Sequence, residues 1–250
     1  MGNPFVVVGA PIHNRDYIVA HYLESLNKLD YPREKLLFMF LANNCDDPTM
    51  GLLSSFKNRR NTTIATFDDV KSSPKRDGAR YNNLVVLRNK LLEAVLSTPA
   101  DLFLSVDSDL IIPPDSINRM VAHSKHVVSG LVYNDLHIGG KRNVPQKHIC
   151  NILAWAGRKD RLGYPAAGHI RNYPENELIK VDITGAFVMM SRKVVEQVRY
   201  SYHTQGEDLG WAANLQSNGF QAWCDTGLRA IHLMTRAELE AYIVSQQVNA

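Results

Sequence analysis

Two carboxylates stand one residue apart, directly after an apolar run. The run from Leu102 to Val106 leads into Asp107-Ser108-Asp109, and a second apolar run, Leu110 to Ile112, follows at once. Charged side chains are costly to bury unless a partner compensates them. Residues i and i+2 of an extended chain point to the same side, so both acids could hold a hard divalent cation such as Mg²⁺ together with substrate phosphates. The simpler interpretation is a strand-to-helix turn in which Asp109 is solvated.

A second pair of acids begins a predicted helix. Glu207 and Asp208 follow Gly206, and a carboxylate at a helix start, next to a sugar acceptor, can take a hydroxyl proton as a general base. The structural alternative is that acids in a first turn interact favourably with the helix dipole.

Single polar residues elsewhere in the chain carry weaker signals. His232 ends a short apolar strand, where a lone histidine is more often a hydrogen-bonded core residue, although a neutral imidazole can complete the shell of a manganese ion. Arg88-Asn89 lies inside a predicted helix. Surface helices commonly carry such a pair, so the pattern alone assigns it no role.

The bulk composition is that of an ordinary globular protein. The chain has 250 residues, of which 45% are hydrophobic and 21% charged, enough to bury a full core. Its net charge of +3 is too small to indicate nucleic acid or membrane as a partner. The three cysteines are far apart and form no C-x-x-C pair, which favours a reducing compartment, and we expect the cytoplasm. We expect neither a signal peptide nor a membrane span, because the start has no basic region and no apolar stretch approaches ~18 residues.

Strands alternate with helices along the first half of the chain. The expected strands are 5–8, 36–42, 62–67 and 102–106, and the expected helices are 15–29, with Asn14 as N-cap, 48–57 and 84–96. This alternation predicts an open, largely parallel sheet with helices on both faces. Ligands of such sheets bind beyond the carboxyl ends of the strands. We therefore expect Pro11 to Arg15, Asn43-Asn44 and the acids at 107–109 to cluster.

The second half of the chain is less regular. We expect strands at 126–132, 179–183, 186–190, 222–225 and 230–233, and helices at 194–199, 207–217 and 235–247. The stretch from Tyr133 to Pro174 has only one clear apolar run, Ile149 to Trp155, and a connection of that length usually carries function. Because no repeat, low-complexity segment or linker interrupts the chain, we expect a single domain, 1–250.

Taken in order, these motifs resemble those of glycosyltransferases with the GT-A fold, most closely the inverting enzymes of family 2. The resemblance runs from Val6 to about Leu233. The matching segments, in chain order, are Pro11-Ile12-His13-Asn14-Arg15, Leu87-Arg88-Asn89-Lys90, the D-x-D strand Phe103 to Asp109, Asp182-Ile183-Thr184-Gly185-Ala186, Gly206-Glu207-Asp208, and Gly219-Phe220, Trp223, Asp225 and His232. The resemblance implies an α/β fold: a single GT-A-type domain with a mostly parallel central sheet, helices on both faces and a smaller mixed sheet on the acceptor side. Residues 1–125 would form the nucleotide-sugar-binding half and residues 126–250 the acceptor-side half.

The resemblance also implies an activity. It is the metal-dependent transfer of a sugar, with inversion, from a nucleotide diphosphate sugar, UDP favoured over GDP. The acceptor would be a hydroxyl or other nucleophile of a glycan, a peptide or a lipid-linked molecule. Asp208 would be the general base, with Glu207 as the second candidate. Mn²⁺ or Mg²⁺ would act as a Lewis acid on the diphosphate, held by Asp109, Asp107 and His232. Asp107 could instead contact the ribose of the nucleotide, and His232 could instead contact the diphosphate.

The nucleotide-binding residues are carried over in the same way. The donor would contact Pro11, Asn14, Arg15, Arg88, Asp107, Ser108 and Asp109. Asp68 or Asp69, at the end of the third strand, could bind the base, because a carboxylate there can accept from the ring N–H of uracil or guanine.

The chain departs from the family pattern in several places, and its loop Lys71 to Arg80 has no match there. The Q-x-x-R-W motif of processive members is absent, so we expect a non-processive enzyme. The segment 133–174 resembles no single subfamily. Its His137, His148, Trp155, Arg158 and Tyr164 are candidates for acceptor recognition on composition alone.

Functions from other classes fit the chain less well. A nucleotidyltransferase or a nicotinamide dehydrogenase would need a glycine-rich loop after the first strand, and residues 9–16, G-A-P-I-H-N-R-D, do not provide one. A non-catalytic nucleotide- or glycan-binding domain would be expected to lose Asp109 and Asp208, and both are present. Another nucleotide-dependent transferase and a binding domain stay open as alternatives.

Overall fold

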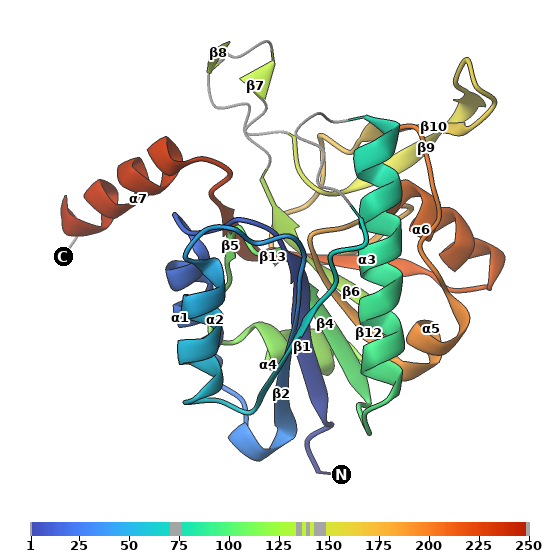
Figure 1. The fold of residues 1–250 in the computed structure, drawn as a ribbon. Helices are drawn as coiled ribbons and strands as arrows, with labels where there is room; N and C mark the ends of the chain where they lie inside the picture. The colour runs from blue at the N-terminus through green and yellow to red at the C-terminus, as the bar shows by residue number, and fades with distance from the viewer. Residues whose placement is uncertain (1, 71–76, 134–136, 139–140, 143–148, 249–250) are drawn as a thin grey trace.

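A nine-stranded sheet forms the centre of the protein (Figure 1). The computed structural model describes residues 2–70, 77–133, 137–138, 141–142 and 149–248. The sheet order is β11-β13-β6-β12-β4-β1-β2-β3, and β5 pairs with β13. Its strands are β1 (Val6–Ile12), β2 (Leu36–Ala42), β3 (Thr62–Thr66), β4 (Leu102–Val106), β5 (Leu110–Ile111), β6 (Val127–Val132), β11 (Leu178–Val181), β12 (Phe187–Ser191) and β13 (Ala222–His232). Six strands run one way and β5, β11 and β12 run the other, so the predicted α/β fold with a mostly parallel sheet is confirmed.

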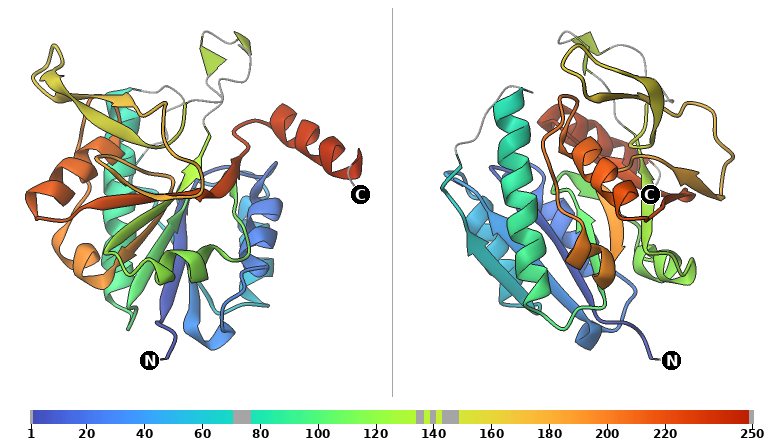
Figure 2. Two further views of the ribbon diagram at one scale, coloured as in Figure 1. Left: turned by 180° about the vertical axis from the view of Figure 1, so that it is seen from behind. Right: turned by 90° about the vertical axis from the view of Figure 1, so that its right-hand side faces the viewer.

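Helices cover both faces of this sheet (Figures 1 and 2). One face is covered by α1 (Val19–Asn27), α2 (Thr49–Lys57) and α4 (Ser116–Ala122), and the other by α3 (Gly78–Leu96), α5 (Arg192–Gln197) and α6 (Glu207–Ser217). A short 3₁₀ helix, Arg33–Lys35, precedes β2, and α7 (Arg236–Val248) projects from the body. No helix in the described part of the chain is long and apolar enough to cross a membrane.

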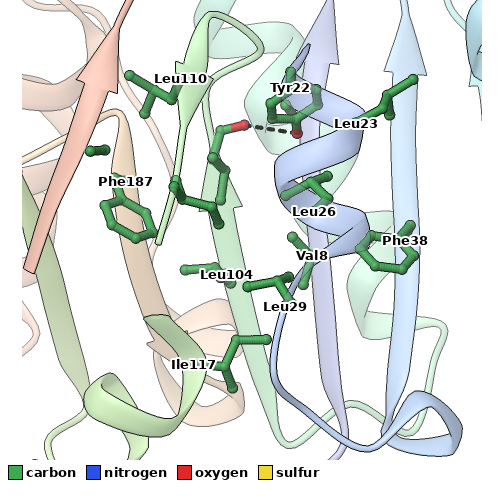
Figure 3. Packing of buried hydrophobic residues seen from close by; sticks show 14 of the residues in the cluster. Val8, Tyr22, Leu23, Leu26, Leu29, Phe38, Leu104, Leu110, Ile117 and Phe187 are labelled. Atoms are coloured by element: carbon green, nitrogen blue, oxygen red, sulfur yellow. Dashed lines mark hydrogen bonds between the residues drawn. The ribbon is translucent and has the colours of Figure 1, made fainter. Parts of the chain in front are cut away.

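Helical spacing explains how α1 packs. Its buried residues include Tyr22, Leu23 and Leu26, which recur every three or four positions and so form one apolar face. Figure 3 shows these side chains directed at β-strand residues such as Val8 and Leu104. The Tyr22 hydroxyl donates a 3.1 Å hydrogen bond to the carbonyl of Val106, which ties α1 to the end of β4.

A smaller sheet stands apart from the large one. It consists of β9 (Leu153–Lys159) and β10 (Pro165–His169), which pair antiparallel. A third sheet of two very short strands, β7 (His137–Ile138) and β8 (Lys141–Arg142), is also antiparallel. The smaller sheet that was expected is therefore present, but it is antiparallel rather than mixed.

Several element boundaries differ from the prediction. β1 continues to Ile12, beyond the expected end at residue 8. A Cβ on Gly9 would lie 2.1 Å from the carbonyl oxygen of Met39 in β2. That glycine serves close strand packing. The helix expected at 15–29 begins only at Val19 with Ile18 as its N-cap, so the assignment of Asn14 as N-cap is wrong.

Two other elements are longer than expected. Helix α3 begins at Gly78 rather than at residue 84, because Asp77 caps it by accepting a 3.0 Å hydrogen bond from the backbone N–H of Arg80. The two short strands expected at 222–225 and 230–233 form one strand, β13, with a register shift between Asp225 and Arg229.

Candidate active site

A pocket of ≈ 610 Å³ opens at the carboxyl ends of β1 and β4. Residues from both halves of the sequence line it, from β1, α3 and the turn after β4 as well as from α6 and β13. Nine of the residues assigned to the site from sequence line the pocket: Pro11, Arg15, Arg88, Asp107, Ser108, Asp109, Glu207, Asp208 and His232. Such a cleft, with convergent polar groups at the ends of parallel strands, is the expected place for a ligand.

Asp109 lies between the guanidinium of Arg15 and the imidazole of His232. Its Oδ2 accepts a hydrogen bond from Arg15 Nη2 at 3.2 Å, and its Oδ1 lies 3.4 Å from His232 Nε2. Burial alone would raise the pKa of Asp109, but the hydrogen bond and charge of His232, with the charge of Arg15, hold this pKa below its ordinary value. For His232, burial acts to lower the pKa, yet Asp109 raises it above the usual histidine value. Asp109 is therefore an anion whose environment keeps it charged.

Asp107 belongs to a different cluster, which centres on Arg88. Arg88 is 6% exposed, and its Nε donates to Glu207 Oε1 at 3.0 Å while its Nη2 donates to Asp107 Oδ1 at 3.0 Å. The guanidinium also lies over the Tyr200 ring, 5.5 Å from its centroid. Burial, with the negative charges of Asp109 and Glu207, raises the pKa of Asp107 despite Arg88. The two acids of the D-x-D segment thus face separate cations.

Asp208 stands at the first turn of α6 and lines the pocket without a hydrogen-bond partner among the described residues. Burial and the neighbouring charge of Glu207 raise its pKa to about 8, against the lowering effect of Arg88. A carboxylate whose pKa lies near the working pH can accept a proton and release it again. Glu207 is committed to its ion pair with Arg88, so Asp208 is the freer of the two acids.

The donor set can be tested for a metal ion. Asp109 and His232 face each other and are 13% and 11% exposed, and carboxylate with imidazole is a ligand pair that Mn²⁺ accepts. Asp107 is turned to Arg88, and within the described ranges no group of three His, Cys, Asp or Glu side chains could hold an ion. Two protein ligands suffice where substrate phosphates supply the others. Asp109 and His232 therefore fit a cation whose shell the substrate completes.

Three predicted nucleotide-binding residues lie outside the pocket lining. Asn14 Nδ2 donates to Asp46 Oδ1 at 2.6 Å, and Asp68 Oδ1 accepts from the backbone N–H of Asn44 at 2.6 Å. Asp69 is exposed. The roles assigned to Asn14, Asp68 and Asp69 stay predictions.

Three acceptor candidates of the segment 133–174, Trp155, Arg158 and Tyr164, are not among the residues that line the pocket. Trp155 Nε1 donates to Gln216 Oε1 at 2.8 Å, and Tyr164 packs edge-on against Tyr202 and His203, so both join the small sheet to α6 and the loop before it. Arg158 is exposed. The side chain of His137 and the whole of His148 lie outside the described residues.

Several lining residues were missed in the sequence. They come from the first turns of α3, from the segment before β9, from β10 and from the loop before α6: Arg80, Tyr81, Leu84, Asn151, His169 and Gln205. Only Asn151 carried a local signal, as the one amide inside the apolar run Ile149 to Trp155. The others reach the site through long-range packing.

Comparisons with known proteins agree with this architecture. No protein-family model matches the chain. The sequence is similar to a glycosyltransferase 25 family member of Aedes aegypti, 19% identical over 145 residues, and to an inactive glycosyltransferase 25 family member 3 of Mus musculus, 28% identical over 120 residues. These matches cover 53% and 44% of this chain but 24% and 20% of the relatives. The chain thus spans about a quarter or less of the curated relatives that it matches.

Solved structures resemble the fold over nearly the whole chain. The mannosyltransferase PcManGT from Pyrobaculum calidifontis, in complex with GDP-Man and Mn²⁺, has a TM-score of 0.61 at 15% identity and covers 97% of this chain and 60% of its own. S. aureus TarS 1–349 has a TM-score of 0.58 at 15% identity over 91% of this chain and 60% of its own. The same protein with UDP-GlcNAc has a TM-score of 0.57 at 15% identity, covering 95% and 61%. The chain therefore has the fold of the GT-A glycosyltransferases, as its sequence motifs indicated.

Proposed function

We propose that the chain transfers a sugar, with inversion and without processivity, from a nucleotide diphosphate sugar to a nucleophile of an acceptor. The observation that carries this proposal is the convergence, in one pocket, of the Asp109–His232 pair with the carboxylate of Asp208, which has no hydrogen-bond partner within the described ranges. The Asp109–His232 pair suits a cation bound to a diphosphate, and the Asp208 carboxylate suits removal of a proton from an acceptor. Residues 1–125 supply the first group except for His232, and residues 126–250 supply the second.

The residues of the chain would divide the work as follows. Asp109 and His232 would hold Mn²⁺ or Mg²⁺, which when bound supplies Lewis-acid stabilisation to the departing diphosphate. Arg15, next to Asp109, would orient the anionic donor by charge. Arg88 would fix Asp107 and Glu207 at the pocket floor. Asp208 would take the proton of the attacking group, because its raised pKa lets it hold that proton near neutral pH.

The finer assignments rest on the structural neighbours. Neighbours of this fold are found with UDP-GlcNAc, UDP, or GDP-Man and Mn²⁺, which supports a nucleotide sugar as donor. Of these we propose a UDP-sugar. A glycan, a peptide or a lipid-linked molecule would serve as acceptor. The three free cysteines, Cys45, Cys150 and Cys224, support a reducing compartment, and we propose the cytoplasm.

Calorimetry tests the donor assignment directly. The purified chain should bind UDP more tightly than GDP, and Mn²⁺ should strengthen binding of the nucleotide. Asp109→Asn should abolish the effect of Mn²⁺, whereas Asp115→Asn, at an exposed acid outside the pocket lining, should preserve it. Failure of the unaltered chain to bind either nucleotide would refute the proposal.

A non-catalytic binding role is the second candidate, because one relative is named as an inactive glycosyltransferase 25 family member. The two functions are separated by release of free UDP from UDP-sugars, with water or a sugar panel as acceptor. The enzyme should release UDP, and Asp208→Asn should stop this release while preserving UDP binding. Nucleotide binding without turnover in the unaltered chain would favour the binding role.

A further inference from the structure

Asp208 lies against the backbone of Gly185. A Cβ built on Gly185 would lie 2.0 Å from Asp208 Oδ2 and 2.4 Å from its Cγ. These distances are far shorter than van der Waals contact, so the carboxylate occupies the space that any other residue would fill with its side chain. The position of Asp208 therefore depends on where the backbone at 185 is held.

That backbone forms a strained turn. The N–H of Phe187 donates to the carbonyl of Gly185 at 2.7 Å, around Ala186, whose φ is +64°. A three-residue turn with a positive central φ is rare, and a non-glycine residue in it is strained. Such a conformation persists only where its surroundings enforce it.

Asn151 is the residue that holds this turn. Its Nδ2 donates to the carbonyl of Gly185 at 2.9 Å, to the carbonyl of Gly130 at 3.0 Å and to Thr184 Oγ1 at 3.3 Å. Its Oδ1 accepts from the N–H of Val132 at 2.8 Å. The side chain is buried and all its polar atoms are used, so it connects the end of β6 rigidly to the turn.

The same turn also contacts the other acid cluster. The carbonyl of Ala186 accepts a 2.8 Å hydrogen bond from the backbone N–H of Asp107. The charges of Glu207, Arg88 and Asp107 influence the pKa of Asp208. The turn at 185–187 is thus the backbone link between Asp107 and the carboxylate of Asp208.

We propose that Asn151 is a positioning residue for Asp208: by locking the turn at 185–187 it fixes the carboxylate of Asp208 relative to Asp107 and the donor side of the pocket. This inference rests on the proposed role of Asp208 as general base. Asn151 touches no reacting atom in this scheme. Its effect on transfer passes through the backbone of Gly185.

Asn151→Ser tests the inference, because a serine hydroxyl is too short to reach the carbonyls of both Gly130 and Gly185. The matched control is Asn214→Ser. Asn214 is also an asparagine with two hydrogen bonds, from its Nδ2 to the carbonyl of Arg199 at 2.9 Å and to Ser201 Oγ at 3.0 Å, but it does not touch the turn. Asn151→Ser removes up to four hydrogen bonds and Asn214→Ser removes two, so a purely structural role predicts lower stability in both variants and no selective effect on Asp208.

The first readout needs no substrate. Carboxyl ¹³C NMR, with the Asp208 resonance assigned by its loss in Asp208→Asn, should show that Asn151→Ser lowers the titration midpoint of Asp208 by about one pH unit or more, because a loosened carboxylate gains water. Asn214→Ser should leave the midpoint unchanged. An unchanged midpoint in Asn151→Ser, with the native spectrum otherwise preserved, would overturn the inference.

The second readout separates this inference from the proposed function. UDP binding with Mn²⁺ should stay within about twofold in Asn151→Ser, while UDP release from a UDP-sugar should fall about 100-fold, the usual effect of a displacement near 1 Å. If the unaltered chain binds no nucleotide, the proposed function fails but the NMR result still decides the role of Asn151. If UDP binding is intact and the rate of UDP release falls equally in Asn151→Ser and Asn214→Ser, the role of Asn151 is refuted while the proposed function stands.

A second background protects the test against misfolding. Ala186→Gly removes the strain of a positive φ and should stabilise the turn. Asn151→Ser in that background should still lower the Asp208 midpoint relative to Ala186→Gly by itself. Equal midpoints in the two proteins would overturn the inference.

Discussion

Arg88 is expected to be worth far more to stability than any exposed arginine of this protein. Its guanidinium is 6% exposed and satisfies two acids, Glu207 at 8% exposure and Asp107 at 30%, each at 3.0 Å. Arg88→Met keeps the apolar stem but leaves both acids without their cation. Loss of one partner from a buried pair costs about 3–5 kcal/mol, because the remaining charge stays desolvated.

Urea unfolding followed by fluorescence measures this cost. With a slope of about 3 kcal/mol per M, typical of larger domains, the midpoint of Arg88→Met should fall by about 1 M or more. The matched control is Arg236→Met. Arg236 pairs with Asp16 at 3.1 Å, but the two side chains are 63% and 41% exposed, so its loss should cost about 1 kcal/mol or less. Equal losses in the two variants would refute the reasoning that burial sets the value of the Arg88 pairs.

The pH dependence supplies an independent check of the same argument. Arg88 lowers the pKa of both Asp107 and Asp208, so its removal raises these pKa values further in the folded state. The folded protein then binds more protons than the unfolded chain, and its stability falls as pH rises. The stability deficit of Arg88→Met should therefore be larger at about pH 8 than at about pH 5. Glu207→Gln in the same chain should recover part of the loss, since it removes one unpaired charge.

Three further predictions concern the acids and the turn. Gly185→Ala should lower UDP release about 100-fold without weakening UDP binding, because the new Cβ would lie 2.0 Å from Asp208 Oδ2. The control is Gly168→Ala, whose Cβ would meet open space, and equal rates of UDP release in the two variants would contradict the contact. The folded-state pKa of Asp208 is about 8, well above its unfolded value, so this group destabilises the fold as pH rises from about 4 to about 8. The melting temperature of Asp208→Asn should lack that decline, and parallel plots of melting temperature against pH for the variant and the unaltered chain would disprove the raised pKa. Burial acts to raise the pKa of Asp225, but His123 and Arg119 lower it overall. Asp225→Asn should therefore be less stable than the unaltered chain at neutral pH, by a margin that shrinks as acid protonates the native carboxylate. A margin independent of pH in thermal melts would count against this ion cluster.

The elements that the sequence predicted best are those with an uninterrupted pattern. β2, β4 and α6 have the predicted boundaries, because each is one apolar run or helical repeat between clear turn residues. β1 was predicted too short, since the glycine at position 9 fits a close strand contact rather than a turn. β13 was predicted as two strands because its register shift between Asp225 and Arg229 places a turn-like stretch inside one element.

The site was predictable in its residues and not in its pairings. The acids at 107, 109, 207 and 208 could be selected from type and spacing, and the structure places all of them in one pocket. Which cation faces which acid depends on contacts across the sheet, such as Arg15 with Asp109, and no local pattern encodes these. Asn151 was missed for the same reason. Its role depends on hydrogen bonds to the carbonyls of Gly130 and Gly185, which lie near it only in the folded chain.

The position of β4 in the middle of the sheet has a consequence for how the chain matures. β4 pairs with β1 from the start of the chain and with β12 from its last third. Arg88 lies 19 residues before Asp107 but meets Glu207 across 119 residues. A nascent chain therefore presents its acids at residues 107 and 109 long before α6 and β13 are synthesised. Contacts of such long range slow folding, so we expect the pocket to be completed late. A chain interrupted before residue 207 would carry the acids at 107 and 109 without the residues of α6 and β13 that set their charge.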